Sequence, residues 1–289
     1  MKNILFGLIP ALMWGIQPII MTKLSGKSEE KVVGMGLGIF LVALFISIFK
    51  RPNNLSSTLI LISFVDGLAL SYGLINQIRG FSLVGISKGT PISTGTQLIG
   101  ATLVGVLYFK EWSSTFQHIL GIIAIILIII GVSMTTFEEK KEENIKKSNL
   151  KKGIITLILS SVGFVLYTVI LKVANINIWD ALIPQGLGVL VGSYLLSKRN
   201  YKEKLFTKNS IKHIITGAIF AIANITLMIS NEINGLSVGF TLTQMNVVIA
   251  TIGGLVILKE KKTKKELIYV LLGLLLVVIG GVFIGITKS

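Results

Sequence analysis

Residues 267–287 read LIYVLLGLLLVVIGGVFIGIT, a stretch without a charged side chain. A helix that crosses the hydrocarbon core of a bilayer needs about 20 mostly apolar residues. Residues 119–137 form a second run without charge. These two runs identify the chain as an integral membrane protein that crosses the bilayer more than once.

The overall composition supports this interpretation. Of the 289 residues, 52% are hydrophobic and only 14% are charged, and the mean hydropathy is +0.81. A soluble domain carries about 25% charged residues, so these charges are too few to cover a soluble surface of this size. Such hydrophobicity also excludes a disordered chain. The absence of cysteine excludes disulfides and thiolate metal sites.

Charge-poor runs predict ten transmembrane helices. The first is expected to be a retained helix, because no small-residue cleavage site follows it. The fourth contains Lys88 and Pro91 and is expected to be tilted or broken near Pro91. The predicted spans are approximately 3–22, 32–49, 58–77, 83–109, 116–137, 153–171, 179–197, 211–231, 236–258 and 267–287.

The sequence also contains an internal repeat. Five short features recur in the same order, at offsets in the numbering between 148 and 150. They are Gly36-Leu37-Gly38 with Gly186-Leu187-Gly188, Lys50-Arg51 with Lys198-Arg199, Gly85-Ile86-Ser87 with Gly235-Leu236-Ser237, Lys110-Glu111 with Lys259-Glu260, and Gly131 with Gly280. Two residues related by this offset are called repeat equivalents below.

This repeat predicts the fold class and the domain organisation. Because five spans are an odd number, the second half must enter the membrane upside down relative to the first, as in many secondary transporters. The expected fold is an all-α integral membrane protein with ten transmembrane helices in two inverted five-helix repeats. The repeats are residues 1–137 and 153–289, and residues 138–152 are a charged, solvated cytoplasmic linker between them.

Basic residues are distributed unequally between the two sets of loops. One set, formed by 23–31, 78–82, 138–152, 198–212 and 259–265, contains 21 lysines and arginines. The other set, with both termini, contains six. Because basic loops stay in the cytoplasm, both termini are expected to be extracellular. The net charge of +15 then reflects membrane topology and contact with anionic lipid, and not binding of nucleic acid.

Polar side chains near the middle of the spans are candidate binding residues, because a polar group in hydrocarbon must face a cavity or a partner. In the fourth span, Thr90, Thr94 and Gln97 share one helix face. In the ninth span, Gln244 and Asn246 lie in a similar stripe, and Asn246 is the repeat equivalent of Gln97. The other candidates at similar depth are Trp14, Gln17, Asn76, Tyr167, Gln185 and Asn224.

Amides and hydroxyls both donate and accept hydrogen bonds, as a sugar hydroxyl does, so these residues suit a neutral, hydroxyl-rich solute. The alternative is helix packing, because small and polar residues commonly make the contacts between membrane helices. The spacings Gly34–Gly38 and Gly188–Gly192 are assigned to such packing.

Asp66 is the only carboxylate near the centre of a predicted span. Placing it there costs roughly 2.5–3.5 kcal/mol on the insertion scale, so it requires a function or a partner. Two interpretations stay open: Asp66 carries the proton that drives transport, or it forms a structural ion pair with Lys88. Asp180 and Glu232 lie at helix ends and are expected to be solvated.

Trp14-Gly15 in the first span and Lys110-Glu111-Trp112 after the fourth, together with the ten spans, resemble the drug/metabolite transporter superfamily. Within it, residues 85–98, GISKGTPISTGTQL, resemble the glucose/ribose porter family, and in that family the glucose uptake proteins of low-GC Gram-positive bacteria. The resemblance covers the whole chain. It implies the drug/metabolite transporter fold and proton-driven sugar uptake at the plasma membrane, with the fifth and tenth helices peripheral to the cavity.

The expected function is import of a monosaccharide, with glucose favoured and ribose kept open, by proton symport with alternating access. The five-helix halves are expected to rock about a mid-membrane site. The expected partners are the sugar, protons and a bilayer with anionic lipid on the basic face. No cofactor or metal is expected, and the oligomeric state stays open.

Three other functions are alternatives to sugar import. A multidrug or cationic-metabolite exporter of the same superfamily is the main alternative, since Asp66 would suit a cationic substrate. An enzyme is not expected, because no paired carboxylates, metal cluster or nucleophile with a base lie at one depth. A non-transporting scaffold is disfavoured by the polar stripes within the spans.

Overall fold

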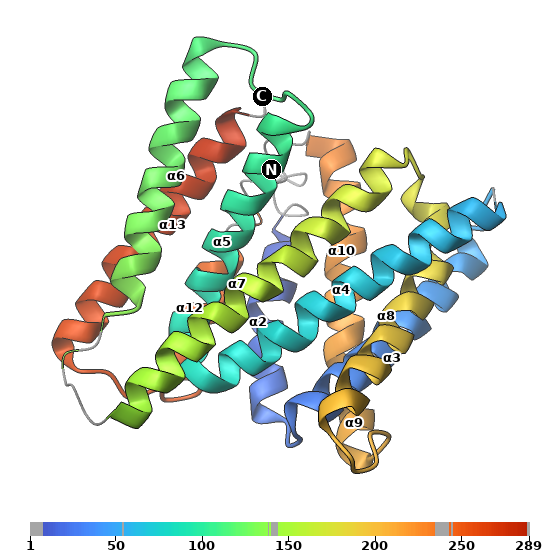
Figure 1. Ribbon diagram of the computed structural model, residues 1–289, viewed down its shortest axis with the longest axis horizontal. Coiled ribbons are helices and arrows are strands. Elements are labelled where there is room, and N and C mark those ends of the chain that lie inside the picture. The colour runs from blue at the N-terminus through green and yellow to red at the C-terminus, as the bar shows by residue number, and fades with distance from the viewer. Residues whose placement is uncertain are drawn as a thin grey trace. The chain divides into compact units, whose positions relative to one another are not determined.

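The computed structural model describes residues 8–53, 55–137, 139, 144–234, 243 and 245–287, and the regular structure of these residues is helical (Figure 1). Each of the ten predicted spans contains a described helix. The helices are α2 (Ile9–Lys23), α3 (Ser28–Phe49), α4 (Ser57–Val84), α5 (Ile86–Leu107), α6 (Thr115–Thr135), α7 (Asn144–Val173), α8 (Ile178–Asn200), α9 (Lys208–Lys212), α10 (Ile214–Asn234), α12 (Met245–Val256) and α13 (Lys264–Thr287).

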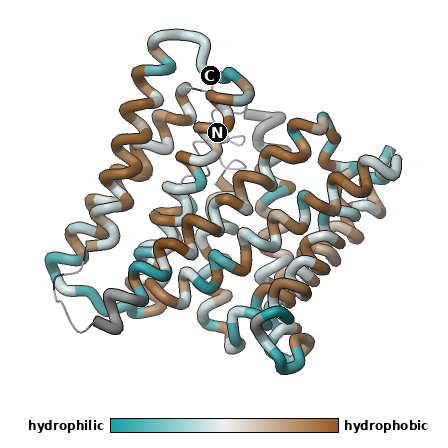
Figure 2. Tube along the Cα trace, viewed as in Figure 1, coloured by the Kyte–Doolittle hydropathy of each residue, from teal (hydrophilic) through white to brown (hydrophobic). Residues whose placement is uncertain are grey.

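Seven of the described helices are long and apolar enough to cross a membrane. Hydrophobic residues run along these helices, whereas hydrophilic residues gather at the turns (Figure 2). Because a lipid environment requires every backbone group to be satisfied internally, helices of this length and composition are the expected solution. The chain is therefore an all-α, multi-pass membrane protein.

Two predicted boundaries differ from the structure. The loop expected at 78–82 is part of α4, because Arg79 is neutralised by Glu29 at 2.8 Å and the helix continues to Val84. The break between α4 and α5 lies instead at Gly85, whose φ of 81° is in the left-handed region that favours glycine. α5 continues unbroken through Pro91. α7 begins at Asn144, inside the segment expected to be a solvated linker.

The chain folds into two compact units, and each unit takes segments from both halves of the sequence. Unit 1 comprises Met1–Ile19, Gly80–Ile158 and Ala223–Ser289, and unit 2 comprises Ile20–Arg79 and Leu159–Ile222. The unit boundaries fall within α2, α4, α7 and α10, so each of these helices contributes residues to both units.

In unit 1, α6 and α13 lie side by side (Figure 1). A Cβ atom added at Gly131 would lie 2.6 Å from the carbonyl oxygen of Gly273, and one at Gly280 would lie 2.8 Å from that of Ala124. The repeat relates these two contacts, because Gly280 is the repeat equivalent of Gly131 and Gly273 is that of Ala124. Small residues thus permit close helix contact, as is common in membranes, and isoleucines of α6 are exposed as expected for a lipid-facing surface.

The two helices also begin alike. Ser114 and Gln117 form a capping box at the start of α6, with backbone-to-side-chain distances of 3.0 and 3.2 Å. Their repeat equivalents, Thr263 and Glu266, make the corresponding bonds at the start of α13, each at 3.2 Å. Reciprocal bonds of this kind satisfy backbone donors that the first turn of a helix leaves free.

α5 and α12 of unit 1 end in the same kind of turn. Lys110 and Lys259 have left-handed φ values of 53° and 54°. The glutamates that follow, Glu111 and Glu260, donate their backbone N–H groups to the carbonyl oxygens of Gly105 and Gly254, at 3.1 and 3.2 Å. The repeated Lys-Glu pair is therefore a repeated local structure as well as a repeated sequence.

Unit 2 shows the same relation between the halves of the sequence. α3 packs on α8, where a Cβ at Gly36 would lie 3.2 Å from the Cα of Leu190. The equivalent pair in the repeat is Gly186 and Phe40, and its corresponding distance is also 3.2 Å.

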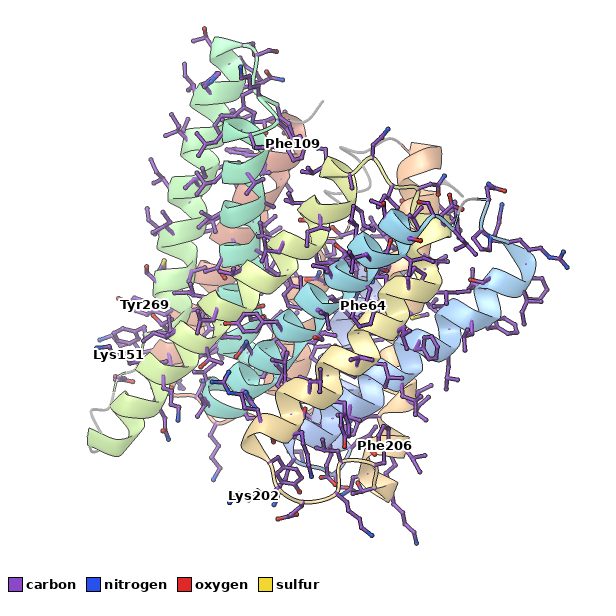
Figure 3. The ribbon with its side chains drawn as sticks, turned by 45° about the vertical axis from the view of Figure 1, so that its right-hand side comes forward. Phe64, Phe109, Lys151, Lys202, Phe206 and Tyr269 are labelled. Carbon is purple, nitrogen blue, oxygen red and sulfur yellow. The ribbon has the colours of Figure 1, made fainter. Side chains whose placement is uncertain are left out.

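The glycine spacings assigned to packing are confirmed. A Cβ at any of these glycines would collide with an atom of a facing segment, and Phe64, labelled in Figure 3, marks the place on α4 that Gly188 of α8 approaches. The facing pairs are Gly34 with Ser210, Gly38 with Ile214, Gly188 with Phe64, and Gly192 with Ser71.

Candidate functional site

The centre of unit 2 contains a buried carboxylate with an amide partner. Asp66 of α4 is 0% exposed, and its Oδ2 accepts a hydrogen bond from Nε2 of Gln185 on α8 at 2.6 Å. No described group donates a hydrogen bond to the other oxygen, Oδ1. The contact is possible because Gly67, the next residue, lets α4 approach the carbonyl oxygen of Gln185. Two residues predicted for the site are thus brought together.

Two other predicted residues of unit 2 lie on neighbouring helices. Tyr167 of α7 is close enough to Asp66 to interact with it electrostatically. Asn76 of α4 is half-buried, and its Nδ2 donates to the carbonyl oxygen of Tyr72, one turn earlier, at 2.9 Å. Asp66, Tyr167 and Gln185 therefore form a polar centre in this unit, whereas the printed contact of Asn76 lies within its own helix.

The repeat gives this polar centre a neutral counterpart. The repeat equivalents of Asp66 and Gln185 are Thr216 and Met35. The helices meet there in the same way, because Gly217 packs against the carbonyl oxygen of Met35 as Gly67 packs against that of Gln185. The hydroxyl of Thr216 donates to a nearby backbone carbonyl, that of His213, at 2.8 Å. Only one of the two equivalent contacts therefore contains an ionisable side chain.

In unit 1, α5 carries the predicted polar stripe. Thr90 is buried, and no described group forms a hydrogen bond with its Oγ1. Thr94 and Gln97 are half-buried, and Nε2 of Gln97 donates to Oγ of Ser93 at 2.8 Å. The stripe thus offers a buried hydroxyl and an amide that retains hydrogen-bonding capacity.

α2 and α12 bring two further candidates together in unit 1. A Cβ at Gly15 would lie 3.2 Å from the carbonyl oxygen of Asn246, so Trp14, the neighbour of Gly15, lies near this part of α12. α5 begins near the end of α12, and Asn246 precedes Gly254 of that end by about 12 Å of helix. Thr94 and Gln97 follow Ser87 by about 10 and 15 Å along α5. These candidates therefore lie at similar distances from the place where Gly254 approaches Ser87.

The remaining candidates of unit 1 are less informative. Gln17 is buried on α2, Asn224 is half-buried on α10, and Lys88 is buried on α5. Gln244 lies outside the described residues. The predicted binding residues are thus distributed over both compact units, and their role in binding stays a prediction.

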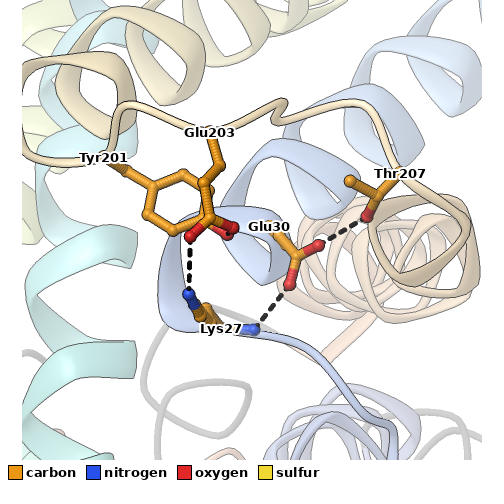
Figure 4. Close-up of polar contacts among 5 residues, drawn as sticks. All are labelled: Lys27, Glu30, Tyr201, Glu203 and Thr207. Atoms are coloured by element: carbon orange, nitrogen blue, oxygen red, sulfur yellow. Dashed lines mark hydrogen bonds and ion pairs between the residues drawn. The ribbon is translucent and has the colours of Figure 1, made fainter.

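Two carboxylates near the starts of helices in unit 2 are buried, which the charge pattern of the sequence does not reveal. Asp180, expected to be solvated, is only 7% exposed, and its Oδ1 accepts from the backbone N–H of Asn53 at 2.6 Å. Glu30, its repeat equivalent, is also buried, and its Oε1 accepts from the hydroxyl of Thr207 at 2.6 Å (Figure 4). Asp180, at the start of α8, thus binds the loop that follows α3, and Glu30, at the start of α3, binds the loop that follows α8. The side chain of Glu232 lies outside the described residues.

A second contact in unit 2 joins the residue before α3 to the loop that follows α8. Nζ of Lys27 lies 3.2 Å from Oε1 of Glu203, and the hydroxyl of Tyr201 donates to Oε2 of Glu203 at 2.6 Å (Figure 4). The hydrogen bond from Tyr201, and then that from Lys27, lowers the pKa of Glu203. The hydrogen bond with Glu203 raises the pKa of Lys27. These groups are exposed, so the contact contributes little to stability.

Comparison with known proteins gives matches along the whole chain. The family model described as sugar transport protein matches residues 5–287. The chain is 47% identical over 287 residues to lmo0169, a proposed sugar uptake protein of Listeria monocytogenes, with 99% of this chain and 100% of that protein covered. It is 40% identical over 288 residues to the glucose uptake protein GlcU of Bacillus subtilis, with 99% of each chain covered.

A solved crystal structure shares the fold. It has a TM-score of 0.63 and 12% sequence identity, and the match covers 100% of this chain and 99% of the solved one. At this identity the likeness concerns the fold alone. The family match and the identities over nearly complete chains establish the kinship: the protein belongs to the sugar transport protein family.

Proposed function

We propose that this protein imports a monosaccharide, with glucose as the first candidate, across the plasma membrane. The observation that carries the proposal is the match to the sugar transport family over residues 5–287, together with 40% identity to a protein named for glucose uptake. The half-buried amides and the buried hydroxyl described above support a neutral, polar substrate. A cationic or multidrug exporter is not favoured by these relatives.

The transporter works by alternating access within a ten-helix inverted repeat. Residues 1–137 and 153–289 are the two repeats, and 138–152 join them in the cytoplasm. The pairs of glycine contacts that the repeat relates to each other support this architecture, since inverted repeats place equivalent contacts about a pseudo-two-fold axis. The five-helix halves rock about a mid-membrane site, and each compact unit takes segments from both of them.

Sugar binding uses amide and hydroxyl groups of unit 1. On α5, Thr90, Thr94 and Gln97 supply donors and acceptors, and on α12 Asn246 supplies a second amide at comparable depth. The indole of Trp14 provides an apolar face on which a sugar ring can stack. A few such groups, set among apolar residues, give orientation and specificity to a small-molecule site.

Asp66 carries the coupling proton. Its burial supports this role, as does Oδ1, to which no described group donates a hydrogen bond. Among the described residues it has no cationic partner, and such a carboxylate is costly in a membrane and gains from protonation. The amide of Gln185 donates to Oδ2 and so holds the carboxyl group in either protonation state. Both termini are extracellular, as the distribution of basic loops favours. A reporter fused at Ser289 that proved cytoplasmic would overturn this orientation.

The substrate is tested with the purified protein in liposomes loaded with unlabelled glucose. Uptake of labelled glucose by exchange should be reduced by external glucose and unaffected by lipophilic cations. Competition by ribose alone would replace glucose with a pentose. Inhibition by lipophilic cations, with no effect of any sugar, would overturn sugar import in favour of the exporter.

A further inference from the structure

The N-terminus of α5 is closed by a carboxylate from a distant part of the chain. Oε1 of Glu260 accepts from the backbone N–H of Ile86 at 2.6 Å, and Oε2 accepts from the N–H of Ser87 at 3.1 Å. The hydroxyl of Ser87 donates to Oε2 as well. All these residues belong to unit 1, although Glu260 lies in the second half of the sequence and its partners in the first.

The backbone around this contact has conformations and glycines that leave space for the carboxylate of Glu260. Lys259 has a left-handed φ of 54°, which turns the chain back after α12. A Cβ at Gly254 would lie 2.9 Å from the backbone nitrogen of Ser87. A Cβ at Gly85, whose φ is 81°, would lie 2.9 Å from Oε2 of Glu260. Larger residues at either glycine would therefore displace the carboxylate or the start of α5.

The first turn of α5 depends on this external partner more than most helix starts do. The first N–H groups of any helix have no acceptor within the helix, and a negative charge is favourable there. Pro91 has no N–H, so the carbonyl of Ser87 also lacks its usual intrahelical donor. The turn that begins the predicted sugar-binding helix is thus weak in itself and is completed by Glu260.

The position of this turn determines where the polar stripe of α5 lies. Thr90, Thr94 and Gln97 follow Ser87 at helical spacing, which places them on the same face of the helix. A rotation or shift of the first turn is passed along a continuous helix to these side chains.

We propose that Glu260 is a positioning residue for transport: it fixes the height and rotation of α5, so that α5 and the turn between α12 and α13 act as one body. This inference rests on the proposed function, in which α5 contributes to the sugar site. Glu260 itself does not contact the sugar. Its effect on uptake is transmitted through the first turn of α5.

The chain offers a matched control and a clean reporter. Glu266 also caps a helix in unit 1. Its carboxylate accepts from the N–H of Thr263 at the start of its own helix and from that of Glu139, and neither of these contacts involves α5. Because the protein has no cysteine, a single Thr94→Cys substitution reports only on α5. Glu260→Ala and Glu266→Ala are compared in this background for maleimide labelling, and without it for the KM and maximal rate of glucose exchange in liposomes.

Glu260→Ala should change the labelling rate of the cysteine by about tenfold and raise the KM for glucose by a similar factor, the scale of one lost charged cap. Glu266→Ala should alter neither value, although its thermal midpoint falls. Equal effects of both variants, or wild-type labelling and KM in Glu260→Ala, would overturn the proposal.

Two measurements keep the test decisive. If Glu260→Ala does not fold, Ser87→Ala removes only the hydroxyl contact, and it should shift the labelling rate in the same direction by a smaller factor; no shift would count against the proposal. If the wild-type protein exchanges no sugar, the proposed function fails, whereas the labelling comparison still decides whether Glu260 positions α5.

Discussion

Replacing Asp66 with asparagine should separate sugar movement from its driving force. The substitution keeps an acceptor oxygen for Nε2 of Gln185, which now donates to Asp66 at 2.6 Å. It also exchanges one buried oxygen without a described donor for an amide nitrogen of similar size. The loss of folding stability should therefore be about 1 kcal/mol, the scale of one neutral hydrogen bond. What disappears is the only proton that this buried position can bind and release.

The expected magnitude follows from the number of carboxylates. In the proposed mechanism one carboxyl group couples one proton to each sugar. One unit of pH gradient is worth about 1.36 kcal/mol, or about a tenfold concentration ratio. Wild-type protein in liposomes that are one pH unit more alkaline inside should therefore accumulate labelled glucose about tenfold. The Asp66→Asn variant should equilibrate glucose without accumulation and should keep sugar exchange at zero gradient.

A control at the equivalent position of the repeat makes this result specific. Thr216, the repeat equivalent of Asp66, is buried and is not ionisable. Thr216→Val removes its hydroxyl without changing the side-chain volume much. This variant should accumulate glucose as the wild type does. Accumulation by Asp66→Asn at the wild-type level would refute the carrier role. Loss of exchange together with accumulation would instead place Asp66 in folding or in sugar binding.

Three further predictions follow from other contacts. Gly188→Ala should lower the free energy of unfolding by about 1–3 kcal/mol, because the new methyl group meets a backbone carbonyl. Gly186→Ala should lower it by less, because its methyl group meets mainly side-chain atoms. Thermal unfolding in detergent measures both variants. Gln97→Ala and Asn246→Ala should each raise the KM for sugar about tenfold with expression intact, and normal uptake in both would remove α5 and α12 from the site. The pKa of Glu203 is lowered, so its stabilising contact is present above its ordinary pKa of 4.5 and is lost as the pH falls. Glu203→Gln should therefore be slightly less stable than the wild type at pH 7 and equal to it well below pH 4. A stability difference that grows on acidification would contradict this prediction.

The helices could be predicted from the sequence because the bilayer imposes a length and an apolar composition on each of them. One boundary failed for a physical reason. Arg79 was placed in a loop because an isolated charge is costly in a helix within a membrane, but Glu29, from a different helix, neutralises it. The true boundary, Gly85, is set by a backbone conformation that hydropathy does not reveal.

The candidate site was predictable only in part. Asp66 stood out because a carboxylate at mid-span is rare. Its partner Gln185 was also identified but was assigned to the sugar, because a pairing between the two halves of the sequence becomes visible only when α4 and α8 are packed together. The partners of the buried Asp180 and the half-buried Glu260 could not be predicted for the same reason: each carboxylate bonds to backbone N–H groups in the other half of the sequence.

The most direct test of the account is uptake by the purified protein alone. Liposomes that contain it and are alkaline inside should accumulate labelled glucose above the external concentration, and a protonophore should abolish that accumulation. Equilibration without accumulation would contradict proton coupling. No protein-dependent entry of glucose or of any other monosaccharide would contradict the central claim that this member of the sugar transport family imports sugar.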